Sequence, residues 1–226
     1  MVERSGGAVP ESDARTPRER YRAQVRDEVK RHAWEQIATA GASALSLNAI
    51  AKRMGMSGPA LYRYFANRDE LITELVRDAY RSLADTFQAR AQAGADLADL
   101  ARALRGWALD DPQRYLLVYG TPVPGYQAPP DTAQIASEMM AILLDAAAAV
   151  EVSAADAVAT PLGEHLADRR AWAGGHPAPV PALRRALAFW TRLHGVLSLE
   201  LAGHFTGMGF DPARLYAAEV DTLTGR

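Results

Sequence analysis

Residues 46–65 read SLNAIAKRMGMSGPALYRYF, and this stretch decides the fold. Ser46 is placed to cap a short helix that Gly55 ends, and Ser57 is placed to cap a second helix predicted to run to Phe65. Two short helices that meet across a glycine turn form a helix–turn–helix, whose second helix enters the major groove of DNA. A tight helical corner with no DNA partner shows the same pattern, so the stretch alone leaves both interpretations open.

The rest of the chain also has helical character, because Ala and Leu dominate and the alternating patterns of strands do not occur. Caps and apolar periodicity predict further helices over 17–40, 67–90, 96–109, 112–119, 131–150, 154–172, 181–205 and 211–223. Stretches rich in Pro and Gly predict loops over 120–130 and 173–180. The fold class is therefore all-α. We expect a disordered tail over 1–16, a DNA-binding domain over 17–82, and a ligand-binding and dimerisation domain over 83–226.

Composition excludes several classes of protein. The chain has 226 residues, of which 49% are hydrophobic and 23% are charged, as is ordinary for a globular protein. It has no cysteine, which excludes disulfides and cysteine-ligated metal sites. No apolar run reaches the roughly 18 residues of a membrane span, and no signal peptide is visible, so we expect a cytoplasmic protein. No hydrolase, zinc-protease or dinucleotide motif occurs, so we predict no catalytic residue, no cofactor and no metal.

Charge is distributed unevenly along the chain. Residues 1–90 carry 15 basic and 12 acidic side chains, although the formal net charge of the whole chain is −2. Arg22, Arg26 and Lys30 are spaced by four, so they form one basic stripe on the predicted first helix. A solvated helix face explains this stripe, and so does an electrostatic contact with DNA.

The stretch between Leu45 and Leu71 resembles the DNA-binding domain of TetR-type transcriptional regulators. The resemblance rests on LNAIA at 47–51, GMS at 55–57, LYRYF at 61–65 and RDEL at 68–71. Further along, WTRLHG at 190–195 resembles the Trp–His–Gly element of one subclass of the family's C-terminal domains. The resemblance implies a homodimeric repressor that binds a pseudo-palindromic operator in double-stranded DNA and is released by a small molecule.

Carried over residue by residue, the resemblance implies that the starts of both short helices and the residues after them contact DNA. The residues so assigned are Ser46, Asn48, Ser57, Gly58, Pro59, Ala60, Tyr62, Tyr64 and Arg68. A phenol and a guanidinium suit phosphate oxygens, so Tyr64 and Arg68 are assigned to the backbone. Gly58 and Ala60 carry little side chain, so base contacts fall to Ser57, Tyr62 and Asn48, assisted by DNA shape. For Tyr62, packing between helices is the alternative.

The second half of the chain suggests a sensor and a dimer interface. The predicted helix 181–205 is apolar nearly all round, so it must be buried on two sides, one against its own domain and one against a second subunit, together with helix 211–223. A central helix in a monomer is the alternative. An apolar or aromatic effector is expected in a pocket lined by Trp107, Tyr115, Tyr119, Trp190 and His194. Ordinary core packing of these residues is the competing explanation. A constitutive DNA-binding regulator without an effector and a helical enzyme are the alternative functions.

Overall fold

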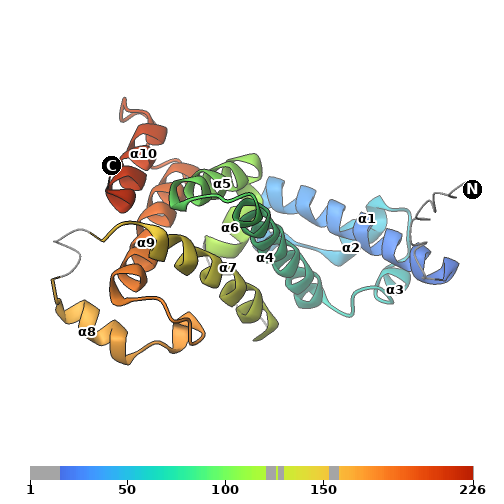
Figure 1. The fold of residues 1–226 in the computed structure, drawn as a ribbon. Helices are drawn as coiled ribbons and strands as arrows, with labels where there is room; N and C mark the ends of the chain where they lie inside the picture. The colour runs from blue at the N-terminus through green and yellow to red at the C-terminus, as the bar shows by residue number, and fades with distance from the viewer. Residues whose placement is uncertain (1–15, 121–125, 127–129, 153–157, 226) are drawn as a thin grey trace, which may run out of the picture. The chain divides into compact units, whose positions relative to one another are not determined.

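The computed structural model describes residues 16–120, 126, 130–152 and 158–225, and these residues form helices and no strand (Figure 1). The predicted all-α class is confirmed. The α-helices are α1 (Pro17–Ala40), α2 (Leu47–Arg53), α3 (Gly58–Leu61), α4 (Arg68–Gln92), α5 (Leu97–Asp110), α6 (Pro112–Tyr119), α7 (Pro130–Ala149), α8 (Pro161–Asp168), α9 (Val180–Leu201) and α10 (Pro212–Thr224). Two short 3-10 turns, η1 (Ala42–Ala44) and η2 (Ala171–Ala173), complete the set. No described helix is both long enough and apolar enough to span a bilayer.

The chain divides into two compact units, one ending at Arg68 and one beginning at Asp69. The first unit contains α1, α2 and α3; the apolar face of α1 packs against α2, and α2 packs against α3. Members of its core with no exposed surface are Val29, Ala33, Ile50, Leu61 and Phe65. Burying a Val, Ile, Leu or Phe side chain stabilises a fold by about 1.5–3 kcal/mol, so these residues contribute strongly to the unit's stability.

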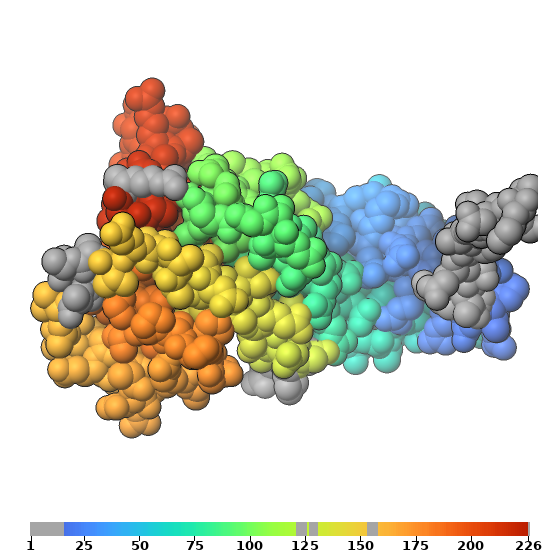
Figure 2. Space-filling model, viewed as in Figure 1, coloured from blue at the N-terminus to red at the C-terminus, as the bar shows by residue number. Residues whose placement is uncertain are grey.

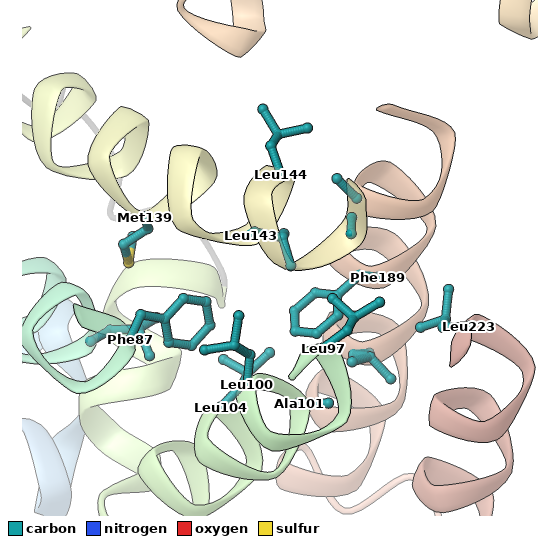
Figure 3. Close-up of a cluster of buried hydrophobic side chains, with 14 of the residues drawn as sticks. Phe87, Leu97, Leu100, Ala101, Leu104, Met139, Leu143, Leu144, Phe189 and Leu223 are labelled. Atoms are coloured by element: carbon teal, nitrogen blue, oxygen red, sulfur yellow. The ribbon is translucent and has the colours of Figure 1, made fainter. Parts of the chain in front are cut away.

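The second unit is built around α9, which packs against α5, α6, α7, α8 and α10. Figure 3 shows its core, in which Phe87 of α4, Leu100 of α5, Leu143 of α7 and Phe189 of α9 are completely buried. The space-filling view shows the helices of this unit packed side by side (Figure 2). Because five helices pack against α9, this helix lies at the centre of the second unit.

Helix α3 is shorter than predicted, since it spans Gly58–Leu61 and does not run to residue 65. Two arginines of α1 bind the carbonyl groups that follow it. Arg22 Nη2 donates to the carbonyl oxygen of Arg63 at 3.3 Å, and Arg26 Nη1 donates to that of Tyr64. These carbonyl groups are therefore satisfied without a continued helix.

Two other predicted helices have different bounds. In place of a helix over 154–172, α8 begins at Pro161, whose fixed ring suits a first helical turn, and Thr160 caps it. Residues 153–157 lie outside the described residues. The helix predicted over 181–205 ends at Leu201, because Gly203 takes a φ of +79° that breaks the helical path. The predicted tail 1–16 and loop 120–130 also lie largely outside the described residues.

Candidate functional site

The candidate DNA-facing surface consists of α2, α3 and the turn between them. Gly55 in the turn has a φ of +67°, a conformation that side-chained residues resist. Ser46 Oγ accepts the backbone N–H of Ala49, and Ser57 Oγ accepts that of Ala60, both at 3.3 Å. Both predicted helix caps are therefore present, and they fix where each short helix starts.

Asn48 and Gly58 come together where α2 meets α3. A Cβ atom at position 58 would lie 3.3 Å from Asn48 Oδ1, so any side chain there would press on the amide. Asn48, Ser57 and Pro59 are exposed, and Tyr62 has 45% of its surface exposed. The exposure of Tyr62 favours an outward contact over packing between helices. The remaining residues assigned to this surface are half-buried, namely Ser46, Gly58, Ala60, Tyr64 and Arg68.

Arg68 has a structural function in addition to its predicted phosphate contact. Its Nη2 donates to the carbonyl oxygens of Ala42 and Ser43 at 2.8 and 3.3 Å. These bonds tie the start of α4 to the η1 turn that precedes α2. Substituting Arg68 would therefore disturb the fold of the first unit as well as any phosphate contact.

The basic stripe of α1 is neither simply solvated nor simply available to DNA. Besides the bond of Arg26 to a carbonyl group, its guanidinium lies 4.2 Å from the centre of the Phe65 ring, a cation–π contact. Lys30 Nζ lies 3.2 Å from Asp27 Oδ1. Arg22 and Arg26 therefore brace the segment after α3 against α1. Sequence reasoning missed this function, because the partners lie far from the stripe along the chain.

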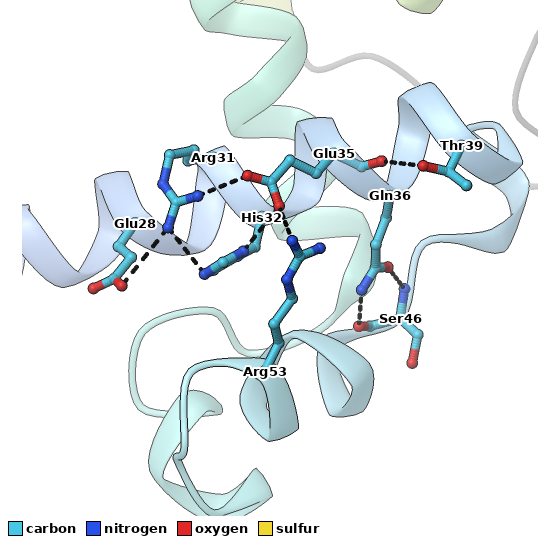
Figure 4. Close-up of polar contacts among 8 residues, drawn as sticks. All are labelled: Glu28, Arg31, His32, Glu35, Gln36, Thr39, Ser46 and Arg53. Carbon is cyan, nitrogen blue, oxygen red and sulfur yellow. Dashed lines mark hydrogen bonds and ion pairs between the residues drawn. The ribbon is translucent and has the colours of Figure 1, made fainter.

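A polar network on α1 holds α2 at both ends (Figure 4). Glu35 accepts hydrogen bonds from Arg31 at 2.6 Å and His32 at 3.2 Å, and it pairs with Arg53 at 2.8 Å. The bond from His32, together with the charges of Arg53 and Arg31, lowers the pKa of Glu35 below its usual value. This network fixes the C-terminal end of α2.

Gln36, the next residue, fixes the other end of α2. Its Oε1 accepts the backbone N–H of Ser46 at 3.0 Å, and its Nε2 donates to the Ser46 carbonyl oxygen at 3.5 Å. One side-chain amide thus pairs with both backbone groups of the residue that caps α2. Neither Glu35 nor Gln36 belongs to a motif that sequence reasoning could have singled out.

In the second unit, the five residues assigned to an effector pocket lie in one cluster. Ring centroids are 6.5 Å apart for Trp107 and Tyr115, 5.3 Å for Tyr115 and Tyr119, 4.3 Å for Tyr119 and His194, and 4.4 Å for Trp190 and His194. Burial lowers the pKa of His194 to about 4 and raises that of Tyr119 well above its usual value. At neutral pH the cluster therefore carries no formal charge.

Surface hollows occur elsewhere in the second unit. One of about 380 Å³ is lined by Trp107 together with Arg90 and Arg102. Another of about 630 Å³ is lined by three arginines of α9 and by Glu151, among others. Among the described residues, no group of three or more His, Asp or Glu side chains is arranged to hold a metal ion.

A three-helix unit with a helix–turn–helix, followed by a larger helical unit, defines a two-domain helix–turn–helix regulator. The chain belongs to the TetR family of bacterial regulatory proteins, whose pattern matches residues 31–75. Residues 97–223 match the tetracyclin repressor-like C-terminal domain. The resemblance seen in the sequence is thereby confirmed. Regulators of this family bind DNA and act as dimers, and they are generally not enzymes.

Relatives along most of the chain are transcriptional regulators. The HTH-type transcriptional regulators Mb1846 of Mycobacterium bovis and Rv1816 of Mycobacterium tuberculosis are each 36% identical over 214 residues, which is 89% of this chain and 92% of each relative. The crystal structure of the protein SCO4313 is 67% identical, with a TM-score of 0.85 over 93% of this chain and 100% of that chain. A Rhodococcus sp. RHA1 protein of unknown function shares the fold at 22% identity, with a TM-score of 0.64 over 89% of this chain and 94% of that chain.

Proposed function

We propose that this protein is a repressor that binds an inverted-repeat operator in double-stranded DNA as a homodimer, and that a small molecule releases it. The observation that carries the proposal is the exposed surface of α2 and α3, where Asn48, Ser57 and Tyr62 face outward from capped helices. Residues 17–82 form the DNA-binding part in this proposal, and residues 83–226 form the sensor and dimer interface. A DNA-binding regulator of this family acts where its operator lies, so we also propose a cytoplasmic location.

The operator test is selection from random duplexes, followed by titration. In a two-fold dimer the two recognition helices lie about 34–36 Å apart, or a multiple of that distance, so the selected half-sites should be spaced to match. Affinity should fall steeply with salt, because phosphate contacts release counterions. A selection that returns no symmetric site would contradict the proposal.

Dimerisation is supported by the face of α9 that its own unit leaves uncovered. Thr191, Arg192, Gly195 and Leu199 are exposed on this face, and Leu199 has 45% of its surface exposed. This face is mixed, with the apolar Leu199 among small and polar side chains, and we infer that a second subunit covers it. Leu201, by contrast, is half-buried and packs against the core of its own unit.

Effector release requires that the small molecule prefer the conformation that does not bind DNA. A tenfold loss of operator affinity needs about 1.4 kcal/mol of such preference. Tyr119 of α6 contacts Tyr80 of α4, with ring centroids 6.1 Å apart, and α4 continues from the last residue of the first unit. We infer that α6 and α4 transmit the change.

A thermal-shift screen of apolar and aromatic compounds tests this step. Compounds that stabilise the protein should also weaken operator binding. If every stabilising compound left operator affinity unchanged, the protein would be a constitutive DNA-binding regulator. Turnover of a compound by purified protein would instead favour the helical enzyme.

A further inference from the structure

The Trp–His–Gly element places an imidazole ring at the centre of the aromatic cluster. His194 has only 9% of its surface exposed, and its ring stacks on Tyr115 with centroids 5.6 Å apart and planes at 21°. Tyr119 and Trp190 flank the same ring. A polar heterocycle thus lies among aromatic side chains, where each of its two nitrogens needs a hydrogen-bond partner.

The hydroxyl of Tyr115 determines which nitrogen of His194 carries the proton. This hydroxyl lies 3.2 Å from the His194 carbonyl oxygen, which can only accept, and 3.0 Å from both His194 Nδ1 and Ser198 Oγ. One arrangement makes all three contacts hydrogen bonds: the Tyr115 hydroxyl donates to the carbonyl, and Nδ1–H and the Ser198 hydroxyl donate to Tyr115. In this tautomer Nε2 has a lone pair and no proton.

Two polar atoms of the cluster have no partner within the described part of the chain. His194 Nε2 and Tyr119 Oη are both buried, and neither makes a hydrogen bond to a described residue. Leaving a buried acceptor unpaired is costly, so a native protein normally supplies a partner. The ring centroids of Tyr119 and His194 are only 4.3 Å apart, so the two unpaired atoms belong to rings in direct contact.

We propose that this cluster recognises an uncharged aromatic molecule that carries an N–H or O–H donor, which pairs with His194 Nε2. The inference rests on the proposed function only in treating such a molecule as the effector. Tyr119 supplies a second polar contact, and Trp190 supplies an aromatic wall. An anion would be desolvated opposite a lone pair, with no cation in the cluster to compensate, so carboxylates are excluded.

Matched probes that differ by one donor test the inference on the full-length protein. Calorimetry would compare indole with 1-methylindole and phenol with anisole, and indole-3-acetate would serve as the anionic probe. Indole and phenol should bind about tenfold more tightly than their methylated counterparts, the value of one net hydrogen bond to a buried acceptor. Indole-3-acetate should bind more weakly than indole.

Three variants locate the donor preference. His194→Asn keeps an amide near Nδ1 but does not reach the position of Nε2, so it should abolish the preference. His194→Gln reaches that position with an amide oxygen and should restore part of it. Ser137→Ala removes an exposed hydroxyl of α7 that bonds to the Ala133 carbonyl of its own helix, and it should leave the preference unchanged. Circular dichroism melting identifies any variant that fails to fold, and Tyr119→Phe, which should reduce affinity for both donors, then serves as the second test.

Equal binding of donors and methylated probes would overturn the inference, as would the absence of binding by all probes at millimolar concentration. A preference for the methylated probes would show that Nε2 carries the proton and would likewise overturn it. Operator titrations without probe report separately on the proposed function. Failure to bind DNA would overturn the repressor while leaving the donor preference intact, and donor binding without loss of operator affinity would overturn only effector release.

Discussion

Replacing Gln36 with alanine should loosen α2 without altering any side chain of the surface proposed to face DNA. The change removes the 3.0 Å bond from Ser46 N–H and the 3.5 Å bond to the Ser46 carbonyl. The first bond has an ordinary length, and the second lies at the upper limit for a hydrogen bond. The free energy of unfolding should therefore fall by about 1 kcal/mol, close to the value of one hydrogen bond. Because Ser46 caps α2, the same change should weaken operator binding several-fold.

Thermal unfolding and fluorescence anisotropy with a labelled operator would measure both effects. Thr39→Val is the matched control, because its hydroxyl bonds only to the exposed Glu35 carbonyl of the same helix and its loss should change neither quantity. In both stability and operator affinity, Gln36→Glu should lie between the wild type and Gln36→Ala, since a carboxylate accepts from Ser46 N–H but cannot donate to its carbonyl. If Gln36→Ala matched Thr39→Val in both assays, the anchoring function of Gln36 would be wrong.

Three further outcomes are expected. Tyr64→Phe should weaken binding to matched and scrambled duplexes alike, and Asn48→Ala should lower only the ratio between them; titrations on both duplexes decide. Leu199→Glu should change the free energy of unfolding by no more than about 0.5 kcal/mol but shift sedimentation from dimer toward monomer. A wild-type protein that is already monomeric at micromolar concentration would contradict the interface. Burial lowers the pKa of His194 to about 4 in the folded protein, whereas the side chain of the unfolded chain has a pKa of about 6.5. Between these two pH values the unfolded chain binds a proton that the folded protein does not. The free energy of unfolding should therefore fall by up to about 3 kcal/mol as the pH drops from about 6.5 to about 4. This fall should be absent in His194→Asn, and equal pH profiles for the two proteins would refute it.

The sequence was sufficient to predict features that depend on neighbours along the chain. The Ser46 and Ser57 caps each involve a backbone group three residues away, so their pattern is visible before folding. Tyr115 and Tyr119 are one helical turn apart, as are Trp190 and His194, so each pair was expected on one helix face. That these faces meet was an expectation that spacing alone could not establish.

Features that depend on distant segments could not be predicted. Arg22 and Arg26 bind carbonyl groups that follow α3, about forty positions away, and a charge pattern does not reveal a backbone partner. Glu35 reaches Arg53 only once α1 and α2 have packed. These polar contacts follow from tertiary packing, which local propensity does not encode.

The use of the α1 arginines as structural donors changes which cations are expected to reach DNA. Lys52 of α2 and Arg63 beyond α3 are exposed, and neither has an ion pair with another described residue. Each contact with one phosphate contributes about 0.9 to the slope of log affinity against log salt. In a symmetric dimer every substitution removes two such contacts.

Lys52→Ala should therefore reduce the magnitude of that slope by about 1.8. Arg31→Gln changes the net charge by the same amount as Lys52→Ala. Because Arg31 is already paired with Glu35, the slope measured for this variant should stay at the wild-type value. Lys52 also lies in the last turn of α2, where a cation stabilises the helix dipole, and loss of that effect would lower the melting temperature without changing the slope. Equal slope reductions in the two variants would mean that the overall field of the protein, rather than a direct phosphate contact by Lys52, governs the salt dependence.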